Sequence, residues 1–516
     1  MSRMYLNVQT DSWGKIPWPK VESFVFRFQT RIYKASLEKN YGKMRALQTR
    51  LAQSVHARLL AVRRVTMDNS SSLRRSQERH NNLITTGPLR MELVRTLKFD
   101  GKAQPIRRTW IPKPGRLAAP GGCPLGNHEV VADRAKQALA QMVLEPEWEA
   151  RFEPNSYGFR PGRSCQDAME ALASLAIRAK YVLDADIAKC FDRINTSCLL
   201  EKLDTYPVMR NQIKAWLKAD IMTGFANRPK SIEPSDSGEP QGGVISPLLA
   251  NIALHGMENA LNEWAQQQAA EGRVILVRYA DDFVVLHKAR RVVQGAQGFL
   301  SQWLQPMGLE LHPDKTRIVT TGEGFHFLAH DVLHLGKGSH GLVRVAPSKK
   351  SQETLLSQTR EVIQSHKGSA VHRLISALVP LILGWGKYFQ FSECSAIFHR
   401  MDWRIFQQLR AWVFRRHPTW GRQRIKHKYF PENQTWRFHG KKYRDNWVLY
   451  DSYMSKGVRK EFNLIRLSWI SSSKHVKVRG TKSPFDGDLI YWSLRLQNHR
   501  TRAEDQRALK VRPKDV

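Results

Sequence analysis

The amino-acid sequence predicts a mixed α+β fold in which helical segments surround a β-sheet with an acidic edge. Residues 274–286 hold two apolar runs rich in β-branched residues on either side of Tyr279-Ala-Asp-Asp282, which is typical of a strand, a tight turn and a second strand. Residues 180–194 contain another β-like run that ends in carboxylates. Helical spacing of apolar residues marks much of the chain before and after these runs.

The acidic residues of these two stretches predict a magnesium site. Asp281 and Asp282 are adjacent, and like charges this close raise each other's pKa unless a cation neutralises them. Asp186, on the other stretch, supplies a third carboxylate. Oxygen ligands favour Mg²⁺ over zinc, and polymerases use two such ions about 3.5–4 Å apart. The alternative is an ordinary hairpin with a polar turn.

The excess of positive charge predicts a polyanionic partner. The chain has 82 Lys and Arg residues against 46 Asp and Glu, a formal net charge of +36 and a pI near 10.2. With 15 Trp and 13 Tyr residues available for stacking, RNA is the natural candidate. A basic membrane-surface protein is the alternative, but no amphipathic anchor stands out. There is also no apolar run of about 18 residues, so we expect no membrane partner.

Cysteine usage favours a reducing compartment. The five cysteines are scattered and odd in number, and they form neither a zinc pattern nor an evident disulfide framework. The first residues of the chain lack the apolar core of a signal peptide.

The remaining elements are predicted in order along the chain. Residues 20–65 are expected to be helical, with basic residues that are either solvated or bound to a partner. Residues 66–90 are polar and weakly patterned, so we expect a loop. Residues 131–178 are expected to be helical on both sides of a basic turn. Residues 238–254 combine a loop shaped by glycines and prolines with an apolar helix.

The C-terminal part is expected to bind RNA. Apolar residues recur at helical spacing through 374–382, and a helix over 401–416 is expected to end before Pro418. A basic and aromatic segment follows at 421–430. Residues 401–516 hold 27 Lys and Arg against 10 Asp and Glu, with 7 of the 15 Trp. We expect the cations to neutralise phosphates and most of the tryptophans to pack in the core.

Six short motifs follow one another along the chain. They are Ile111-Pro-Lys-Pro114, Asn155-Ser-Tyr-Gly-Phe-Arg-Pro-Gly-Arg163, Asp184-Ala-Asp-Ile187 with Phe191-Asp192, Pro240-Gln-Gly-Gly-Val-Ile-Ser-Pro-Leu-Leu-Ala-Asn251, Tyr279-Ala-Asp-Asp282 and His312-Pro-Asp-Lys-Thr316. In this order they resemble the group II intron-encoded reverse transcriptases and maturases of bacteria and organelles. The resemblance covers most of residues 20–500 and is very specific.

The resemblance implies a right-hand polymerase within the α+β class. It implies an N-terminal basic helical extension at 1–90, reverse transcriptase fingers and palm at 91–335, and an α-helical thumb, or maturase (X) domain, at 336–430. A basic nucleic-acid-binding region is expected at 431–516. Relatives continue with a zinc-supported HNH endonuclease, which we do not expect here because its paired Cys-x-x-Cys motifs are missing.

The resemblance also implies an activity and partners. Such a protein binds group II intron RNA and promotes its splicing. It then copies the RNA into DNA, adding dNTPs to a primer 3′-OH at a DNA target through two Mg²⁺ ions. A homodimer is left open.

The family motifs assign candidate site residues by position. Asp186, Asp281 and Asp282 are expected to be catalytic and, with the Ile187 carbonyl, to hold Mg²⁺. Contacts to the incoming nucleotide are expected from Lys113, Arg116, Phe191, Gln241, Gly242 and Lys315. Contacts to nucleic acid are expected from Arg107, Arg108, Arg160, Arg163, Tyr279, Arg415, Arg416, Arg422, Arg424, Lys426 and Lys428. Phe191 is either a steric gate against a nucleotide 2′-OH or a packing residue. Asp184 and Asp192 are expected to be structural.

Three stretches depart from the family pattern. Relatives carry a Lys-Lys-Thr-x-Gly-x-Asp-Gly segment that helps hold the template, and it is absent after Asn69. Cys123 stands where relatives have a phosphate-clamping Arg. Loss of such a charged hydrogen bond, worth about 1.5–3 kcal/mol, would weaken nucleotide binding unless Arg116 substitutes for it. Ala329 stands where relatives have Gly, either harmlessly or in a strained turn.

Two other functions remain open. The altered fingers favour a non-enzymatic RNA-binding splicing factor with a degenerate polymerase, whereas the intact carboxylates favour an enzyme. A reverse transcriptase recruited to a role outside introns is the third alternative. Local frameshifts would also explain the altered stretches, and resequencing would test this. The expected location is the bacterial cytoplasm, or a plastid or mitochondrion if the gene is organellar.

Overall fold

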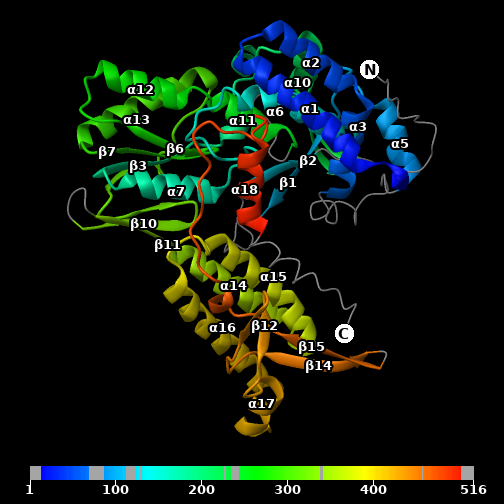
Figure 1. The fold of residues 1–516 in the computed structure, drawn as a ribbon, viewed down its shortest axis with the longest axis vertical. Helices are drawn as coiled ribbons and strands as arrows, with labels where there is room; N and C mark the ends of the chain where they lie inside the picture. Colours follow the sequence, from blue (N-terminus) through cyan, green and yellow to red (C-terminus); the bar gives the residue numbers. More distant parts are fainter. Residues whose placement is uncertain are drawn as a thin grey trace. The chain divides into compact units, whose positions relative to one another are not determined.

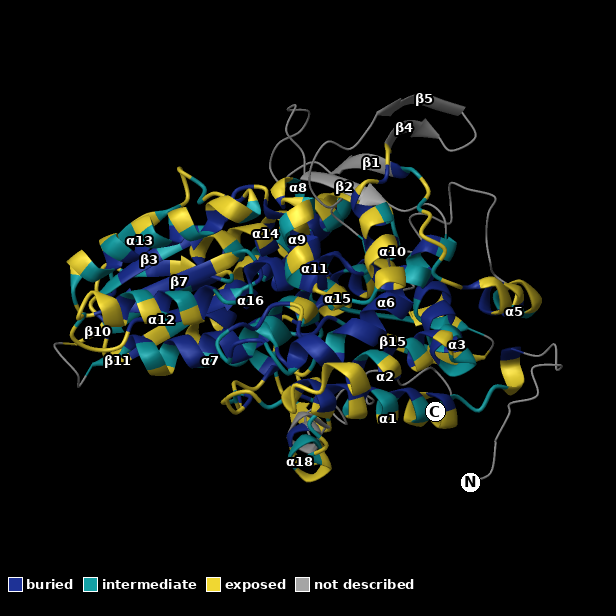
Figure 2. Ribbon diagram, turned by 90° about the horizontal axis from the view of Figure 1, so that it is seen from above, coloured by how far each residue is buried: buried dark blue, intermediate teal, exposed yellow. Residues whose placement is uncertain are grey.

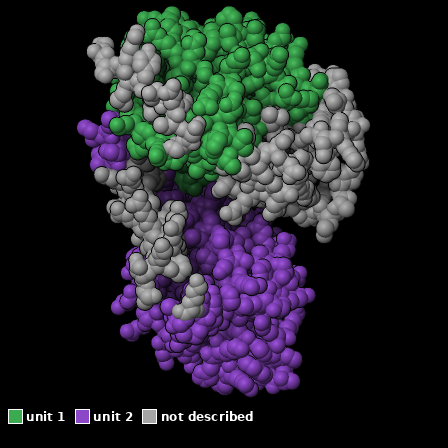
Figure 3. Space-filling view, turned by 90° about the vertical axis from the view of Figure 1, so that its right-hand side faces the viewer, with its two compact units in different colours: residues 1–168, 185–318, 478–488 green, residues 169–184, 319–477, 489–516 purple. Residues whose placement is uncertain are grey.

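The computed structural model of the 516-residue chain forms a mixed fold of helices and strands, as predicted (Figure 1). It describes residues 13–68, 86–111, 123–127, 131–225, 228–233, 243–336, 341–455 and 457–500. The chain divides into two compact units (Figure 3). Unit 1 comprises residues 1–168, 185–318 and 478–488, and unit 2 comprises residues 169–184, 319–477 and 489–516.

Three helices occupy the region 20–65, for which the sequence predicts helical structure. They are α1 (Trp18–Leu37), α2 (Tyr41–Gln53) and α3 (Val55–Arg63). Asn40 begins α2 because its side chain accepts a hydrogen bond from the Lys43 backbone N–H at 3.1 Å, and the Ser54 side chain begins α3 in the same way. Such caps satisfy backbone groups that a helix start leaves unpaired. Helix α6 (Val131–Glu149) packs against all three.

Shorter elements and a small sheet also belong to unit 1. The short elements are η1 (Trp13–Lys15), η2 (Arg64–Asp68), α5 (Gly87–Thr96), α8 (Cys190–Arg193), α9 (Thr196–Leu203), α10 (Pro207–Leu217), α11 (Ser246–Leu254) and η3 (Gln305–Met307). The sheet has the order β2-β1-β4-β5, formed by β1 (Ile106–Ile111), β2 (Cys123–Asn127), β4 (Ile221–Phe225) and β5 (Arg228–Glu233). Strand β1 is antiparallel to β2 and parallel to β4. The loop expected at 66–90 is only partly described. Residues 66–68 belong to η2, residues 69–85 lie outside the described parts, and α5 begins at Gly87.

A second sheet carries the acidic residues. Its order is β6-β7-β3-β8, formed by β6 (Ile275–Tyr279), β7 (Asp282–His287), β3 (Tyr181–Asp186) and β8 (Arg317–Thr320). Strands β6 and β7 form the predicted antiparallel hairpin. All five residues after Asp282 in β7 are buried (Figure 2). Burial of both faces explains why this strand is a continuous apolar run and does not alternate with polar residues.

Two helices support this hairpin. Helix α13 (Arg290–Leu304) packs against both β7 and α12 (Met257–Gln267). At the contact between the helices, the rings of Trp264 and Phe299 stack with centroids 5.6 Å apart. Helix α7 (Cys165–Ala176) lies between the basic turn and β3 in the sequence.

Unit 2 contains a small antiparallel sheet with the order β11-β10-β9. Its strands are β9 (Phe325–Phe327), β10 (His330–Leu335) and β11 (Leu342–Pro347). The residues that join β9 to β10, Leu328 and Ala329, have φ angles of +46° and +64°. Ala329, which replaces a glycine of relatives, therefore adopts the strained alternative, because a β-carbon disfavours this backbone region by roughly 1–2 kcal/mol.

The rest of unit 2 is mainly helical, in agreement with the helical structure predicted within 336–430. The helices and hairpins are α14 (Lys349–Ser365), α15 (Val371–Phe389), α16 (Ser395–Arg416), α17 (Arg422–Tyr429), β12 (Trp436–Phe438), β13 (Lys441–Tyr443), β14 (Tyr450–Ser455), β15 (Val458–Asn463), η5 (Leu467–Trp469) and α18 (Leu489–Arg500). Trp412, Trp436 and Trp469 belong to its hydrophobic core, whereas Trp403 is 61% exposed. Across the described ranges, no helix combines the length and the apolar character needed to cross a membrane.

A segment near the C-terminus returns to unit 1. The Val478 backbone N–H donates to the Asp167 carboxylate at 2.7 Å, and the Gly480 carbonyl accepts from Arg163 at 2.7 Å. The Phe485 ring lies 6.3 Å from the Phe26 ring of α1. Residues 478–488 thus form a strap, a short segment that ties the N-terminal helices to the basic turn.

Two glycines of α13 allow a matched test of its packing. A β-carbon on Gly298 would meet nothing within 4 Å, so Gly298→Ala should raise the free energy of unfolding by about 0.5–1 kcal/mol through helix propensity. A β-carbon on Gly295 would lie 2.8 Å from the Trp264 ring, so Gly295→Ala should lower that free energy by about 1–3 kcal/mol. Urea unfolding of both variants checks this. Equal stabilisation by the two substitutions would contradict the packing described.

Candidate functional site

The acidic turn is a tight connection between β6 and β7. Tyr279 and Asp282 are paired across the hairpin, which leaves Ala280 and Asp281 as the turn residues. Ala280 has a φ of +57°, a conformation that costs a non-glycine residue free energy and persists only where the surroundings enforce it. The Asp281 side chain is half-buried beside this strained residue.

Three carboxyl groups meet at this end of the sheet. Asp186 ends β3, and its carboxyl group is hydrogen-bonded to that of Asp282 at the start of β7. Although Asp282 reaches the surface, burial of its carboxyl group, this hydrogen bond and the charges of Asp281 and Asp186 raise its pKa to about 7. Burial and the charge of Asp186 also raise the pKa of Asp281. The close approach of the three predicted metal ligands therefore disfavours the charged forms of Asp281 and Asp282.

Lys315 places a cation against these carboxylates. Its ammonium group donates to the Asp186 carboxylate at 2.6 Å, while 60% of the side chain remains exposed. The hydrogen bond to Asp186 and the charges of the three aspartates raise the pKa of Lys315. The residue is held in place because the His312 backbone N–H donates to the Asp186 carbonyl at 2.8 Å. The motif at 312–316 is thereby joined to the end of β3.

The donor set suits a divalent cation, but the side chains are arranged around Lys315. Carboxylate oxygens are the preferred ligands of Mg²⁺. Within the described ranges, no group of three or more His, Cys, Asp or Glu side chains is arranged to hold a metal ion. A metal ion would take the place of the proton on Asp282 and compete with the ammonium group of Lys315. Asp186, Asp281 and Asp282 are the residues that would hold it.

The turn at 155–160 supports the acidic hairpin through backbone hydrogen bonds. The Arg278 N–H donates to the Asn155 carbonyl and the Arg278 carbonyl accepts from the Tyr157 N–H, both at 2.9 Å. Next to them, a β-carbon on Gly158 would lie 2.4 Å from the Ala280 nitrogen. Only glycine allows the two backbones to approach this closely.

Arg278 supports the same hairpin through its side chain. It is 1% exposed and donates from Nη1 to the Ala280 carbonyl at 3.2 Å and to Asn251 at 3.1 Å. The Asn251 side chain in turn donates to the Gly158 carbonyl at 2.7 Å. Sequence reasoning quoted these residues within motifs but assigned them no role. A charged residue inside an otherwise apolar strand was the signal that could have identified Arg278.

A buried carboxylate balances the charges below the hairpin. Glu153 lies 3.0 Å from His255 Nδ1 and accepts from the Gly256 N–H at 2.5 Å. Burial alone would raise the pKa of Glu153, but the hydrogen bond to His255 and the charges of His255 and Arg278 lower it from 4.5 to about 2. Glu153 is therefore fully ionised at neutral pH and partners the buried cations.

Arg160 and Arg163 point into the protein. Arg160 is buried and pairs with the Glu149 carboxylate through two hydrogen bonds of 2.8 and 3.1 Å, and it also donates to two backbone carbonyls. Arg163 is buried and donates to the carbonyls of Pro154 and Gly480 at 2.7 Å. The structure therefore uses both arginines to hold the turn and the strap, and it does not present them to a nucleic-acid phosphate as the sequence predicts.

Other predicted site residues are placed on the described elements near the carboxylates. Ile187 is buried and bridges to Leu311. Phe191 is half-buried in the short helix α8 and not in a strand. Tyr279 is half-buried at the end of β6, and its ring lies 6.3 Å from that of Phe159.

Two of the predicted nucleic-acid contacts lie on a strand of the small sheet. Arg107 and Arg108 lie on β1. Four predicted nucleotide contacts fall outside the described residues, namely Lys113, Arg116, Gln241 and Gly242.

The predicted basic residues of unit 2 divide into two groups. Arg415, Arg422, Arg424 and Lys428 are exposed. Arg416 donates to the Ser369 carbonyl, and Lys426 pairs with Glu432, so both are half-buried and engaged within the protein. Arg424 and Lys428 lie over the Trp420 ring at 4.1 and 4.9 Å from its centroid. We define the exposed group on α17, with Trp420, as the α17 basic face.

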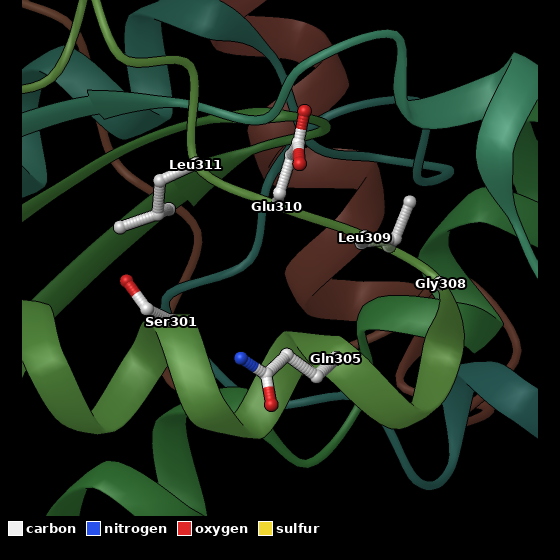
Figure 4. Close-up of a pocket in the computed structure, with 6 residues that line it drawn as sticks. All are labelled: Ser301, Gln305, Gly308, Leu309, Glu310 and Leu311. Atoms are coloured by element: carbon white, nitrogen blue, oxygen red, sulfur yellow. The ribbon is translucent and has the colours of Figure 1, made fainter.

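A cavity of about 410 Å³ has Leu311 in its lining, and Leu311 bridges to Ile187, the residue after Asp186. The cavity is lined by Ser301, Gln305, Gly308, Leu309, Glu310 and Leu311 (Figure 4). The close-up shows the Glu310 side chain pointing away from Ser301 and Gln305. The Glu310 carbonyl accepts from the Ala188 N–H at 2.9 Å, and its side chain pairs with Arg193. None of these lining residues carries a predicted catalytic group.

The ionisation of Glu153 predicts how stability depends on pH. A carboxylate whose pKa is lower in the folded state stabilises that state above its unfolded pKa of 4.5 and loses this effect as the pH falls towards 2. Glu153→Gln should therefore lower the free energy of unfolding by about 3 kcal/mol at pH 7, with a difference from wild type that shrinks below pH 4.5. Urea unfolding between pH 7 and 3 measures this.

Glu38 provides the matched control for this experiment. It forms an exposed ion pair with Lys43 at 3.4 Å, so Glu38→Gln should change the free energy of unfolding by less than about 0.5 kcal/mol at any pH. Parallel pH curves for wild type and Glu153→Gln would show that Glu153 does not balance the buried cations.

Comparison with known proteins gives three family models that match the chain in succession. The N-terminal domain of reverse transcriptase matches residues 13–97. The reverse transcriptase (RNA-dependent DNA polymerase) model matches residues 111–332. The maturase-specific domain of group II introns matches residues 352–430. Reverse transcriptases in general use divalent metal ions, which agrees with the oxygen donors of the site.

Curated relatives carry related names. Protein YkfC of Escherichia coli is 29% identical over 309 residues, 52% of this chain and 78% of that protein. The group II intron-encoded protein LtrA of Lactococcus lactis is 33% identical, but over only 32% of this chain and 27% of its own length. Maturase-like protein 1 of Euglena gracilis is 24% identical over 74% of this chain and 78% of its length.

Solved structures add little to these matches. Telomerases of Candida tropicalis and Candida albicans match with TM-scores of 0.31 and 0.34 at 16% and 11% identity, too low to support a structural argument. They cover 39% and 62% of this chain and 43% and 63% of their own. From the three successive family models and the named relatives, the chain belongs to the group II intron-encoded reverse transcriptases and maturases.

Proposed function

We propose that this protein is an RNA-directed DNA polymerase and an intron maturase. It binds group II intron RNA, promotes its splicing and copies it into DNA from a DNA primer and dNTPs. The observation that supports the polymerase is the meeting of Asp186, Asp281 and Asp282 at the ends of neighbouring strands, where burial and the neighbouring carboxylates raise the pKa of Asp281 and of Asp282. Clusters of carboxylates with perturbed pKa values are typical of functional sites.

The side chains suggest how the reaction is organised. Bound Mg²⁺ ions would supply charge neutralisation and an activated primer 3′-hydroxyl. Asp282 would release its proton to solvent on holding such an ion, and Lys315 would be able to exchange the Asp186 carboxylate for a phosphate of the nucleotide. The turn of Ala280 is held rigid by Arg278 and Gly158, so the carboxylates need not reorganise during the reaction.

The remaining contacts are proposed on the family motifs. Phe191, in α8 just after Asp186, is the proposed gate against a 2′-OH. Lys113, Arg116, Gln241 and Gly242 are the other proposed nucleotide contacts. Arg107, Arg108 and Tyr279 are proposed to contact the template and primer. The α17 basic face and Arg415 are proposed to bind intron RNA, because exposed cations beside an aromatic ring suit phosphates and bases.

A non-enzymatic splicing factor is the second candidate. The observation that favours it is the arrangement of the carboxylates around Lys315, with no preformed group of three metal-binding side chains within the described ranges. In such a protein the ammonium group replaces the metal ion and the polymerase unit serves as an RNA-binding scaffold. We place either protein in the bacterial cytoplasm, or in a plastid or mitochondrion if the gene is organellar.

Primer extension distinguishes the two candidates. Wild-type protein should extend a DNA primer on an RNA template with dNTPs and Mg²⁺. Asp281→Ala should slow extension at least about a thousandfold, because about 4 kcal/mol of charge stabilisation is lost. Asp314→Ala is the matched control: Asp314 is exposed next to Lys315 and should not affect the rate.

Two results would decide against the polymerase. Absence of extension by the wild type, with tight binding to intron RNA retained, would establish the splicing factor. Undiminished extension by Asp281→Ala would show that the carboxylates are not the site.

The salt dependence of RNA binding tests the α17 basic face. Each phosphate contact that is lost should reduce the slope of log K against log salt concentration by about 0.7–0.9. Arg422→Ala and Lys428→Ala should each produce such a change on intron RNA, measured by filter binding at several salt concentrations. Arg459→Ala is the control, because Arg459 already pairs with Glu461 at 3.3 Å. Unchanged slopes for the α17 variants would place the RNA elsewhere.

A further inference from the structure

Phe159 combines a strained backbone with a largely exposed aromatic side chain. Its φ is +57°, a left-handed conformation that costs a residue with a β-carbon roughly 1–2 kcal/mol. Its side chain is 55% exposed, so burial of the ring offsets little of this cost. Strained residues of this kind persist only where their surroundings enforce them, and they cluster at functional sites.

The neighbours of Phe159 fix it on both sides. Gly158 packs against the Ala280 nitrogen, and its carbonyl accepts from Asn251 at 2.7 Å. Arg160 is locked in its buried ion pair with Glu149. The backbone between these two anchors has no freedom to relax, so the chain is built to hold the ring of Phe159 outward.

The ring is held beside the acidic turn. Its centroid lies 6.3 Å from that of Tyr279, with the two rings tilted by 45°. Tyr279 immediately precedes the turn residues Ala280 and Asp281. Two neighbouring aromatic rings, one of them largely exposed, therefore lie beside the hairpin that carries Asp281 and Asp282.

We propose that Phe159 is a base-stacking residue, whose ring packs on one nucleobase of the nucleic acid bound at the acidic turn. An exposed aromatic ring stacks on any base, which suits a protein that must copy every sequence. The inference deepens the proposed function and rests on it, since a template or primer must lie at the turn. It assigns a binding contact to the residue that immediately precedes the buried Arg160, whose side chain serves the fold.

Two substitutions separate the ring from the strain. Phe159→Ala removes the ring and keeps the strained β-carbon. Phe159→Gly removes the ring and also relieves the strain, because glycine adopts a positive φ freely. Phe159→Gly should therefore be at least as stable as wild type in thermal unfolding, and more stable than Phe159→Ala. A loss of stability in Phe159→Gly would identify the ring as a packing residue and overturn the proposal.

Binding is measured on a DNA primer annealed to an RNA template, by fluorescence anisotropy without dNTPs. Phe159→Ala and Phe159→Gly should both bind about 10- to 100-fold more weakly than wild type, the range expected for one lost stack. Phe159→Trp should bind as wild type does, because it restores a stacking ring. Wild-type affinity in Phe159→Gly would overturn the proposal.

Abasic substitutions identify the base. A single abasic nucleotide is moved through successive positions of the template and then of the primer. At one position it should weaken wild type by the same factor as Phe159→Gly and have no further effect on that variant. Independent effects at every position would show that the ring stacks on no base.

The assay separates this inference from the polymerase proposal. Duplex binding that depends on the ring, without extension by the wild type, would support the inference and reject the polymerase. Extension by wild type with unchanged binding and extension by Phe159→Gly would reject the inference alone. Failure of the wild type to bind the duplex would overturn both.

Discussion

Three carboxylates cannot keep full negative charge close together in a partly desolvated place, and this constraint organises the centre of unit 1. Two features reduce the repulsion: the pKa of Asp282 is raised to about 7, which favours its uncharged form, and the ammonium group of Lys315 pairs with Asp186. The proton of that uncharged form and the ammonium group are both easily exchanged for a stronger cation. The arrangement of the three carboxylates therefore favours the binding of metal ions.

The same constraint explains why several buried residues support the turn. Charges that repel each other would spread a flexible loop, so the turn needs a frame that does not yield. Arg278 donates to the Ala280 carbonyl from inside the sheet, and Glu153 balances the buried cations. Gly158 brings a second backbone against the turn. Rigid supporting contacts of this kind are what hold catalytic groups in a productive arrangement.

How much could be predicted from the sequence depended on the range of the interaction. The β6–β7 hairpin was predictable because its apolar runs and polar turn are local features. The breaks at Asn40 and Ser54 were also locally encoded as helix caps, although the prediction treated 20–65 as one region. Family motifs brought Asp186 together with the hairpin, which lies about ninety residues further along the chain.

Interactions between distant or unremarkable residues were not predictable. Arg160 sits in a basic motif, and nothing in the motif reveals that Glu149, eleven residues earlier, neutralises it. Similarly, no local pattern links Arg163 to Gly480, which lies 317 residues away. A cluster of Lys and Arg in a sequence therefore indicates a nucleic-acid-binding surface only once the residues that form buried contacts have been excluded. Here the exposed cations on α17 survive that test and the two arginines of the turn do not.

The strap at 478–488 has a consequence for the order in which the protein forms. Unit 1 takes its first segment from residues 1–168 and its last from residues 478–488, which are synthesised after all of the intervening chain. Until that segment leaves the ribosome, the Arg163 contact to Gly480 and the Asp167 contact to Val478 cannot exist. At roughly 5–20 residues per second, the N-terminal helices wait on the order of 15–60 s for these partners. Unit 1 is therefore completed only after residues 478–488 have been translated, so a product terminated before residue 478 lacks the contacts of the strap to Arg163 and Asp167.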